Sequence, residues 1–107
     1  RLHFEFNKRL YQIPYRDIVY MESRRRIIHL FGRNGEEYRF YKKMKDLLEE
    51  ISHTGNMFIR VHCSYVVNYY YIKSLSSTEA ELLTGEKLPV SGEYKNEALK
   101  KFMGMME

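Results

Sequence analysis

The sequence has few residues that cross-link or interrupt a fold: its 107 residues include two prolines and one cysteine. Tryptophan is absent. The single cysteine, Cys63, excludes an internal disulfide and is consistent with a reducing, cytoplasmic environment. No apolar run reaches the roughly 18 residues that a membrane-spanning helix needs, and the start does not resemble a signal peptide. No internal repeat or low-complexity linker is present. We therefore expect a cytoplasmic chain that does not enter a membrane.

The abundant residues indicate a globular domain rich in strands. Hydrophobic residues make up 44% of the chain and charged residues 30%, a composition typical of folded proteins. Ten tyrosines and six phenylalanines favour strands over helices. At this length we expect residues 1–107 to form a single domain. Because the first residue is Arg1 and not methionine, we expect this domain to be part of a longer protein.

Positive charge is concentrated in the first part of the chain. Residues 1–45 hold 12 Lys and Arg against 5 Asp and Glu, a balance of +7. Residues 46–107 hold 6 against 9, a balance of −3, which gives the net charge of +4. An uneven distribution of this kind suggests a polyanion as partner for the basic part.

Alternation of apolar and polar residues predicts a mostly β fold of antiparallel sheets with one short central helix and one C-terminal helix. The helices are expected at 42–53, ended by Gly55, and from Ser91 as N-cap onward. Residues 78–83 fit either a strand or, through a possible capping box at Ser76 and Glu79, a helix start, and we favour the strand because the segment is short. The other strands are expected at 2–6, 10–13, 18–23, 27–31, 36–41, 57–61, about 70–77 and 87–90.

Residues 58–72 are the longest run of β-branched and aromatic residues, and a polar cluster interrupts it. Residues 65–67 are apolar at three successive positions, which a half-exposed strand cannot use. We therefore expect a tight turn or a single helical turn at 63–68. The polar cluster, consisting of Arg60, His62, Ser64 and Asn68, is expected at this turn.

Two basic segments are candidate anion contacts. Residues 24–26, all arginine, follow a predicted strand and either contact a polyanion or form a solvated turn. If the strand continued through them, at most two of the three side chains would point the same way. Lys42, Lys43 and Lys45 lie at a helix start, where the helix dipole disfavours cations, so either an anion approaches there or the helix end is simply exposed.

The sequence contains no complete set of residues for a catalytic site or a metal site. His62 and Cys63 are adjacent and would point to opposite faces of a strand, and no second cysteine or clustered His, Asp and Glu completes a site. We therefore predict no catalytic residue, no metal and no cofactor. Residues 69–71, all tyrosine, would stack on nucleic-acid bases or, more commonly for strand tyrosines, pack in the fold.

Three ordered motifs resemble those of one family. The central motif is Phe58-x-Arg60-x-His62-x-Ser64-Tyr65-x-Val67-Asn68 followed by Ile72. Residues 18–23, with the sequence IVYMES, precede it, and Gly85-x-x-Leu88-Pro89-Val90-Ser91 follows it. Together they resemble the LytTR-type DNA-binding domain over essentially the whole chain.

The resemblance implies the fold and the partners. LytTR domains are antiparallel β-sheets with short helices, and they bind double-stranded DNA at paired promoter repeats through loops that enter successive major grooves. They are output domains of bacterial response regulators, usually C-terminal to a receiver domain that a histidine kinase phosphorylates. The resemblance thus implies a transcriptional regulator that pairs as a homodimer on DNA. The alternative is a module of this fold with weakened DNA binding that acts mainly through protein contacts.

The resemblance also assigns roles to residues, and these stand as expectations. Arg24 and Arg25 follow the family's Glu-Ser pair and are the expected base readers, with Cys63 and Glu93 at the positions of the second and third readers. Cys63 is a weak donor with short reach, and Glu93 can accept from a cytosine amino group but is repelled by phosphates. Glu93 and the −3 balance of residues 46–107 favour the alternative, whereas residues 24–26 favour DNA binding. His62 and Asn68 are expected to support the turn. Expected phosphate contacts are Arg26, Lys42, Lys43, Ser64, Ser91 and Lys95.

Overall fold

The computed structural model, which describes residues 1–106, has ten strands, two α-helices and three short 3₁₀ segments. The expected mostly β fold with a central and a C-terminal helix is confirmed. The strands are β1 (Leu2–Phe6), β2 (Arg9–Ile13), β3 (Ile18–Arg24), β4 (Ile27–Gly32), β5 (Glu37–Tyr41), β6 (Phe58–His62), β7 (Tyr65–Asn68), β8 (Ile72–Leu75), β9 (Glu79–Leu82) and β10 (Lys87–Pro89). The helices are α1 (Met44–Glu50) and α2 (Lys95–Met105), and the 3₁₀ segments are η1 (Tyr15–Asp17), η2 (Ser52–Thr54) and η3 (Tyr69–Tyr71).

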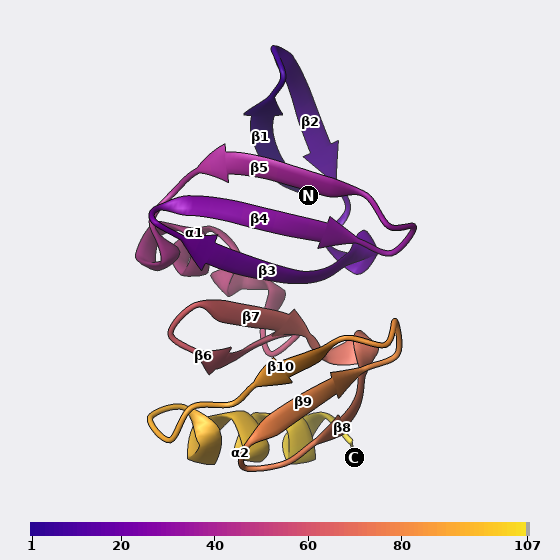
Figure 1. Ribbon diagram of the computed structural model, residues 1–107, viewed down its shortest axis with the longest axis vertical. Coiled ribbons are helices and arrows are strands. Elements are labelled where there is room, and N and C mark those ends of the chain that lie inside the picture. Colours follow the sequence, from indigo (N-terminus) through magenta and orange to yellow (C-terminus); the bar gives the residue numbers. More distant parts are fainter. Residues whose placement is uncertain (107) are drawn as a thin grey trace.

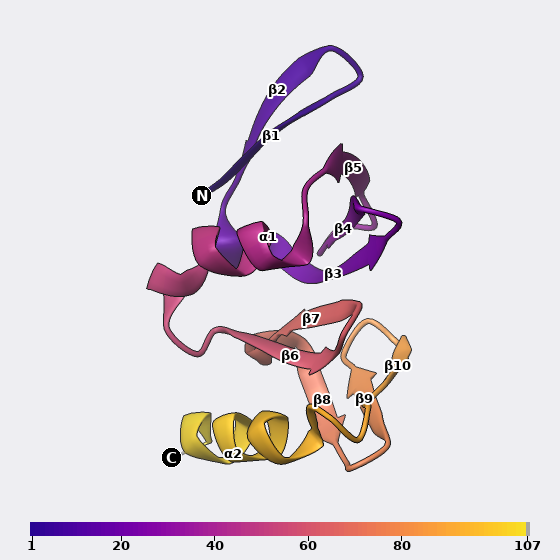
Figure 2. The ribbon, with the colours of Figure 1, turned by 90° about the vertical axis from the view of Figure 1, so that its left-hand side faces the viewer.

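Three antiparallel sheets are stacked along the long axis of the molecule (Figure 1). The five-stranded sheet has the order β5-β4-β3-β7-β6, and the three-stranded sheet has the order β10-β9-β8. Strands β1 and β2 form a separate hairpin at the N-terminal end. The molecule measures 39 × 25 × 25 Å, and Figure 2 shows α1 on one side of the β6–β7 hairpin and α2 on the other.

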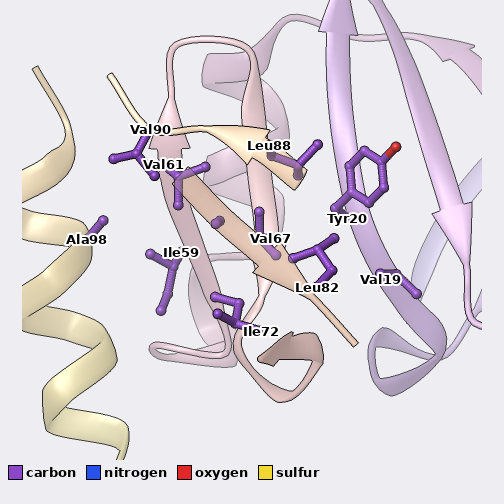
Figure 3. Packing of buried hydrophobic residues seen from close by; sticks show 11 residues of the cluster. Val19, Tyr20, Ile59, Val61, Val67, Ile72, Leu82, Leu88, Val90 and Ala98 are labelled. Carbon is purple, nitrogen blue, oxygen red and sulfur yellow. The ribbon is translucent and has the colours of Figure 1, made fainter. Parts of the chain in front are cut away.

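Strand β7 separates two hydrophobic cores. Val66 is fully buried in the core formed with α1 and β1, whereas Val67 is fully buried in the core formed with α2 and the three-stranded sheet. Figure 3 shows Val67 in this second core, which also contains Ile72, Leu82 and Leu88. The turn or single helical turn expected at 63–68 is confirmed only at residues 63–64, and it is wrong for residues 65–68, which form β7. The apolar run 65–67 belongs to a strand that is paired with β3 and β6 at its edges. The two cores cover its two faces.

The hairpin between β6 and β7 turns at Cys63 and Ser64, since His62 is paired with Tyr65. Asn68 lies at the opposite end of β7 from this turn. The expected cluster of four polar residues is thus divided: Arg60, His62 and Ser64 are at the turn, and Asn68 is not. The four residues that follow the turn, 65–68, form a strand, β7.

The two helices are shorter than expected from 42–53 and from Ser91 onward. Met44 begins α1, and the chain after Glu50 tightens into η2 before Gly55, which has a positive φ of 70°. The N-cap of α2 is Tyr94, with no side-chain cap. Ser91 instead contributes its backbone carbonyl, which accepts the N–H groups of Tyr94 and Lys95 at 3.1 and 3.0 Å.

The segment at 78–83 is a strand, as expected. The Ser76 hydroxyl accepts the backbone N–H of Glu79 at 3.1 Å, and the two residues also pair through their backbones at 2.9 Å. The capping-box pattern therefore closes the turn that leads into β9 and does not start a helix. Within residues 1–106, no helix has the length and apolarity needed to span a membrane.

Candidate nucleic-acid interface

Three connections lie next to one another along one edge of the molecule. The first is the β3–β4 turn at Arg25 and Arg26, the second is the β6–β7 turn at Cys63 and Ser64, and the third is the β10–α2 loop at 91–93. The Ser23 N–H donates to the Ser64 carbonyl at 2.9 Å, which ties the first turn to the second. The Ser91 N–H donates to the Val61 carbonyl at 2.9 Å, which ties the third to β6. We call these three connections the turn edge; they follow one another down the left side of Figure 1.

The β3–β4 turn is a two-residue hairpin. Arg24 is paired with Ile27, and Arg25 and Arg26 have positive φ values of 50° and 67°. Both central residues of a type I′ turn require positive φ, and this geometry matches the right-handed twist of the strands. The strand therefore ends at Arg24, so alternation does not decide where Arg25 and Arg26 point. Both are exposed.

Arg24 differs from its two neighbours because its guanidinium is held. Its Nη2 donates to Glu22 Oε1 at 2.7 Å, and Glu22 Oε2 accepts the hydroxyl of Tyr65 at 3.1 Å. The hydrogen bond from Arg24 lowers the pKa of the Glu22 carboxyl, an effect that burial opposes and the Tyr65 hydrogen bond reinforces. Glu22 is thus ionised and fixed beside the first turn.

The start of α1 brings further positive charge to the first turn. The backbone N–H of Lys42 donates to the Arg26 carbonyl at 3.0 Å. The Lys42 ammonium pairs with Glu50, which neutralises it in part, while Lys43 is exposed at the N-cap of α1. The expected contacts Arg24, Arg25, Arg26, Lys42 and Lys43 therefore come from two chain segments that meet at one end of the turn edge.

The second turn is stabilised by side chains on its own hairpin. His62 Nδ1 accepts the backbone N–H of Ser64 at 3.1 Å, and the Arg60 guanidinium donates to the Cys63 carbonyl at 2.8 Å. Cys63 is exposed, with its Sγ 3.5 Å from His62 Nδ1. Ser64 is half-buried at the boundary with the first turn.

Arg60 also links the second turn to the third connection. Its guanidinium lies over the ring of Tyr94, 4.5 Å from the ring centre. The sequence does not predict this contact, because it joins residues that only the pairing of β6 with the β10–α2 loop brings together. In the sequence, the alternate spacing of Arg60, His62 and Ser64 indicates that Arg60 takes part in the second turn, but it does not indicate Tyr94 as a partner.

The third connection carries charged side chains and an exposed glycine. Gly92 and Glu93 are exposed, and Lys95 is half-buried at the first position of α2. The Ser91 hydroxyl oxygen is buried and has no hydrogen-bond partner within residues 1–106. A phosphate contact by this hydroxyl stays a prediction, and it requires the side chain to rotate toward solvent.

Asn68 lies away from the turn edge, inside the fold. It is fully buried, its Nδ2 donates to the Ile18 carbonyl at 2.8 Å, and its Oδ1 accepts the Tyr70 N–H at 3.0 Å. The side chain therefore joins β3 to the start of η3. This arrangement also explains why residues 69–71 form a 3₁₀ turn and β8 begins only at Ile72.

Within residues 1–106, no group of three or more His, Cys, Asp or Glu side chains is arranged to hold a metal ion. The polar side chains of the turn edge are mainly hydrogen-bond donors and cations, which suit contacts to phosphates and to the acceptor-rich major-groove edge of guanine.

The chain is similar to known domains in sequence and in fold. A family model described as the LytTr DNA-binding domain matches residues 8–103. Among solved structures, the chain is similar to the LytTr DNA-binding domain of a methyl-accepting/DNA response regulator from Bacillus cereus. The TM-score is 0.75 at 21% sequence identity, over 96% of this chain and 95% of that chain, so the two share a fold. No curated protein matches significantly.

Proposed function

The chain belongs to the LytTR family of DNA-binding domains, and we propose that it binds double-stranded DNA sequence-specifically by inserting the turn edge into successive major grooves. The observation that carries this proposal is the alignment of three connections on one edge, tied together by the Ser23–Ser64 and Ser91–Val61 backbone hydrogen bonds. Loops held on a rigid scaffold are the usual carriers of binding residues.

Dimensions and charge support the proposal. The molecule is 39 Å long, comparable with one turn of B-DNA, which is about 34–36 Å. The three connections follow one another along the long axis of the molecule (Figure 1), so an elongated domain lying along the duplex can present separate connections to adjacent major grooves on the same side of the DNA. The cluster of three arginines and two lysines at one end of the edge supplies electrostatic attraction to the phosphates.

We assign base reading to the residues that the turns present and phosphate contacts to those around them. Arg24 and Arg25 read the first groove, since arginine forms two hydrogen bonds with guanine O6 and N7. Cys63 in the second turn and Glu93 in the third connection are the other readers, and Glu93 accepts from a cytosine amino group. The phosphate contacts are Arg26, Lys42, Lys43, Ser64, Ser91 and Lys95.

We also propose that the chain is the output domain of a bacterial response regulator. The similar domain from Bacillus cereus is described as part of a response regulator, which supports this context. In this proposal residues 1–107 form one domain of a longer chain, with a receiver domain upstream that a histidine kinase phosphorylates. The DNA sites are paired, and two copies bind them as a dimer.

A protein-binding module is the second candidate. The exposed carboxylate of Glu93 in the third connection favours it, because a phosphate backbone repels that charge. The negative balance of residues 46–107 favours it as well.

Selection of sites from a random duplex library at low salt tests the proposal. We expect enrichment of one motif, and we expect binding of that motif to exceed binding of a scrambled duplex by about a thousandfold or more. A triple variant with alanine at Arg24, Arg25 and Arg26 is expected to recover no motif. If the unaltered protein enriches no sequence, the proposal is contradicted and the protein-binding candidate is favoured.

A further inference from the structure

The guanidinium of Arg24 is held by a residue in the middle of the five-stranded sheet. Glu22 lies on β3 directly opposite Tyr65 of β7, and the carboxylate bonds Arg24 with one oxygen and Tyr65 with the other. The Glu22 side chain is 14% exposed, whereas the Arg24 side chain is 55% exposed. A nearly buried anion thus holds a cation that projects from the turn edge.

The carboxylate itself is fixed from both sides. β3 lies between β4 and β7, and Glu22 faces His29 on one neighbour and Tyr65 on the other. The Tyr65 ring packs edge-on against the His62 ring with their centres 5.5 Å apart, so the hydroxyl that bonds Glu22 is fixed too. We call Glu22, with its hydrogen bonds to Arg24 and Tyr65, the bracket. Tyr65 directly follows Ser64, so the bracket connects the first turn with the second.

We propose that Glu22, braced by Tyr65, is the positioning residue that makes Arg24 select one base pair; the inference rests on the DNA-binding function proposed above. One of the five N–H donors of the guanidinium is occupied by Glu22, and the others remain available to guanine O6 and N7. The bracket restricts Arg24 to one direction, whereas a free arginine reaches phosphates as readily as bases.

The charge of Glu22 gives the bracket a second effect. A carboxylate near the duplex repels phosphates, so it lowers the affinity for every sequence while it orients the arginine for one. Specificity is a difference between affinities, and a repulsive group contributes to it when the correct contact offsets the repulsion. Arg26 sits on the exposed turn itself and acts mainly as a phosphate contact beside the bracketed arginine, whereas Arg25 reads the same groove from that turn.

The test uses Glu22→Gln and Tyr65→Phe, with binding measured on the selected site, on its single-base variants and on random duplex. Glu22→Gln keeps the shape of the side chain and removes its charge. We expect it to raise affinity for random duplex and to reduce discrimination at one base pair by about tenfold, within the range of a bidentate arginine contact. Tyr65→Phe keeps the ring packing and should reduce the same discrimination by a smaller factor.

Glu81→Gln is the matched control. Its carboxylate bonds Ser74 at 3.2 Å and lies 3.9 Å from the Lys73 ammonium, both in the three-stranded sheet, so the variant removes the same charge away from Glu22, Tyr65 and Arg24. We expect Glu81→Gln to change all affinities by one common factor. Thermal unfolding of each variant shows whether the fold is kept, and Tyr65→Phe reports on the bracket even if Glu22→Gln lowers stability.

A double-mutant cycle completes the test. In an Arg24→Ala background, Glu22→Gln should no longer alter base discrimination, because the arginine that it positions is gone. Equal effects of Glu22→Gln on all sequences, or the same loss of discrimination with and without Arg24, would overturn the inference while leaving DNA binding in place. Failure of the unaltered protein to bind any duplex would overturn the proposed function as well.

Discussion

Asn68 shows how a single buried polar residue determines local structure. Its amide bonds a carbonyl on β3 and an amide N–H in η3, so both its donor and its acceptor functions are used inside the fold. Such a residue is common where the backbone changes from strand to turn, because its side chain can replace a missing backbone partner. The residue therefore stabilises the sheet that carries the turn edge.

Asn68→Ala should destabilise the protein by about 1–3 kcal/mol, because it leaves buried backbone groups without partners. Urea unfolding measures the change. Asn56→Ala, at an exposed position before β6, is the control and should alter stability little. Unchanged stability combined with lost DNA binding would show that Asn68 contacts DNA.

Tyr20 gives the protein a stability limit at high pH. Burial, together with the nearby carboxylates of Glu86 and Glu22, raises the pKa of Tyr20 to about 12 from 10.0. The folded state therefore keeps the phenol proton longer than the unfolded state does. The stabilisation is complete below the unfolded pKa of about 10 and is lost as the pH rises toward 12.

We expect Tyr20→Phe to reduce the loss of stability between pH 10 and 12 by on the order of 2 kcal/mol, because it removes the titrating group and keeps the ring. Urea unfolding across this pH range provides the measurement. If the variant and the unaltered protein show the same dependence on pH, another group causes the loss.

At the scale of elements, β7 carries the two cores on its opposite faces. Val66 and Val67 are both fully buried, yet they lie in different cores. The strand thereby fixes the second turn relative to both α1 and α2.

Val66→Ala and Val67→Ala should each destabilise the protein by about 2 kcal/mol, from lost burial and the remaining cavity. Leu10→Ala is the control, since Leu10 is 87% exposed and should have an effect below about 0.5 kcal/mol. Thermal unfolding checks all three variants. A small effect at either valine would show that one face of β7 is not packed.

Most strands were predictable because alternation and turn residues are local signals. Strand β1, strand β9 and both sides of the β4–β5 connection followed from them. The turn at 63–68 was mispredicted because an apolar run has no period, and only the tertiary position of β7 between two cores explains it. For the turn edge, the motifs indicated which connections matter. The Glu22–Tyr65 bracket and the Arg60–Tyr94 contact were not predictable, because they depend on strand pairing between distant segments.

At the scale of the whole molecule, the separation of charge along the chain becomes a separation in space. The basic residues of the first turn and of the α1 start gather at one end of the turn edge, while Glu93 is exposed in the third connection. The end with Arg24, Arg25 and Arg26 therefore attracts DNA most strongly, and the binding of the domain should depend on salt.

Neutralisation of about four to six phosphates should give a slope of roughly −4 to −5 in log affinity against log salt. Arg26→Ala should make this slope shallower by about 1 and weaken all sequences alike, whereas Arg24→Ala should mainly weaken discrimination at one base pair. Fluorescence anisotropy on the selected site and on random duplex measures both quantities. Equal effects of the two substitutions on every sequence would mean that both arginines act only through charge.

Methylation interference on the selected duplex tests most directly whether the turn edge enters successive major grooves. Methyl groups at guanine N7 lie in the major groove, so they block a protein that reads there. We predict interference at two groups of guanines on one face of the duplex, about 10–10.5 base pairs apart, and loss of one group in Arg24→Ala. Binding that is unaffected by N7 methylation, with interference only from minor-groove modifications, would contradict the account.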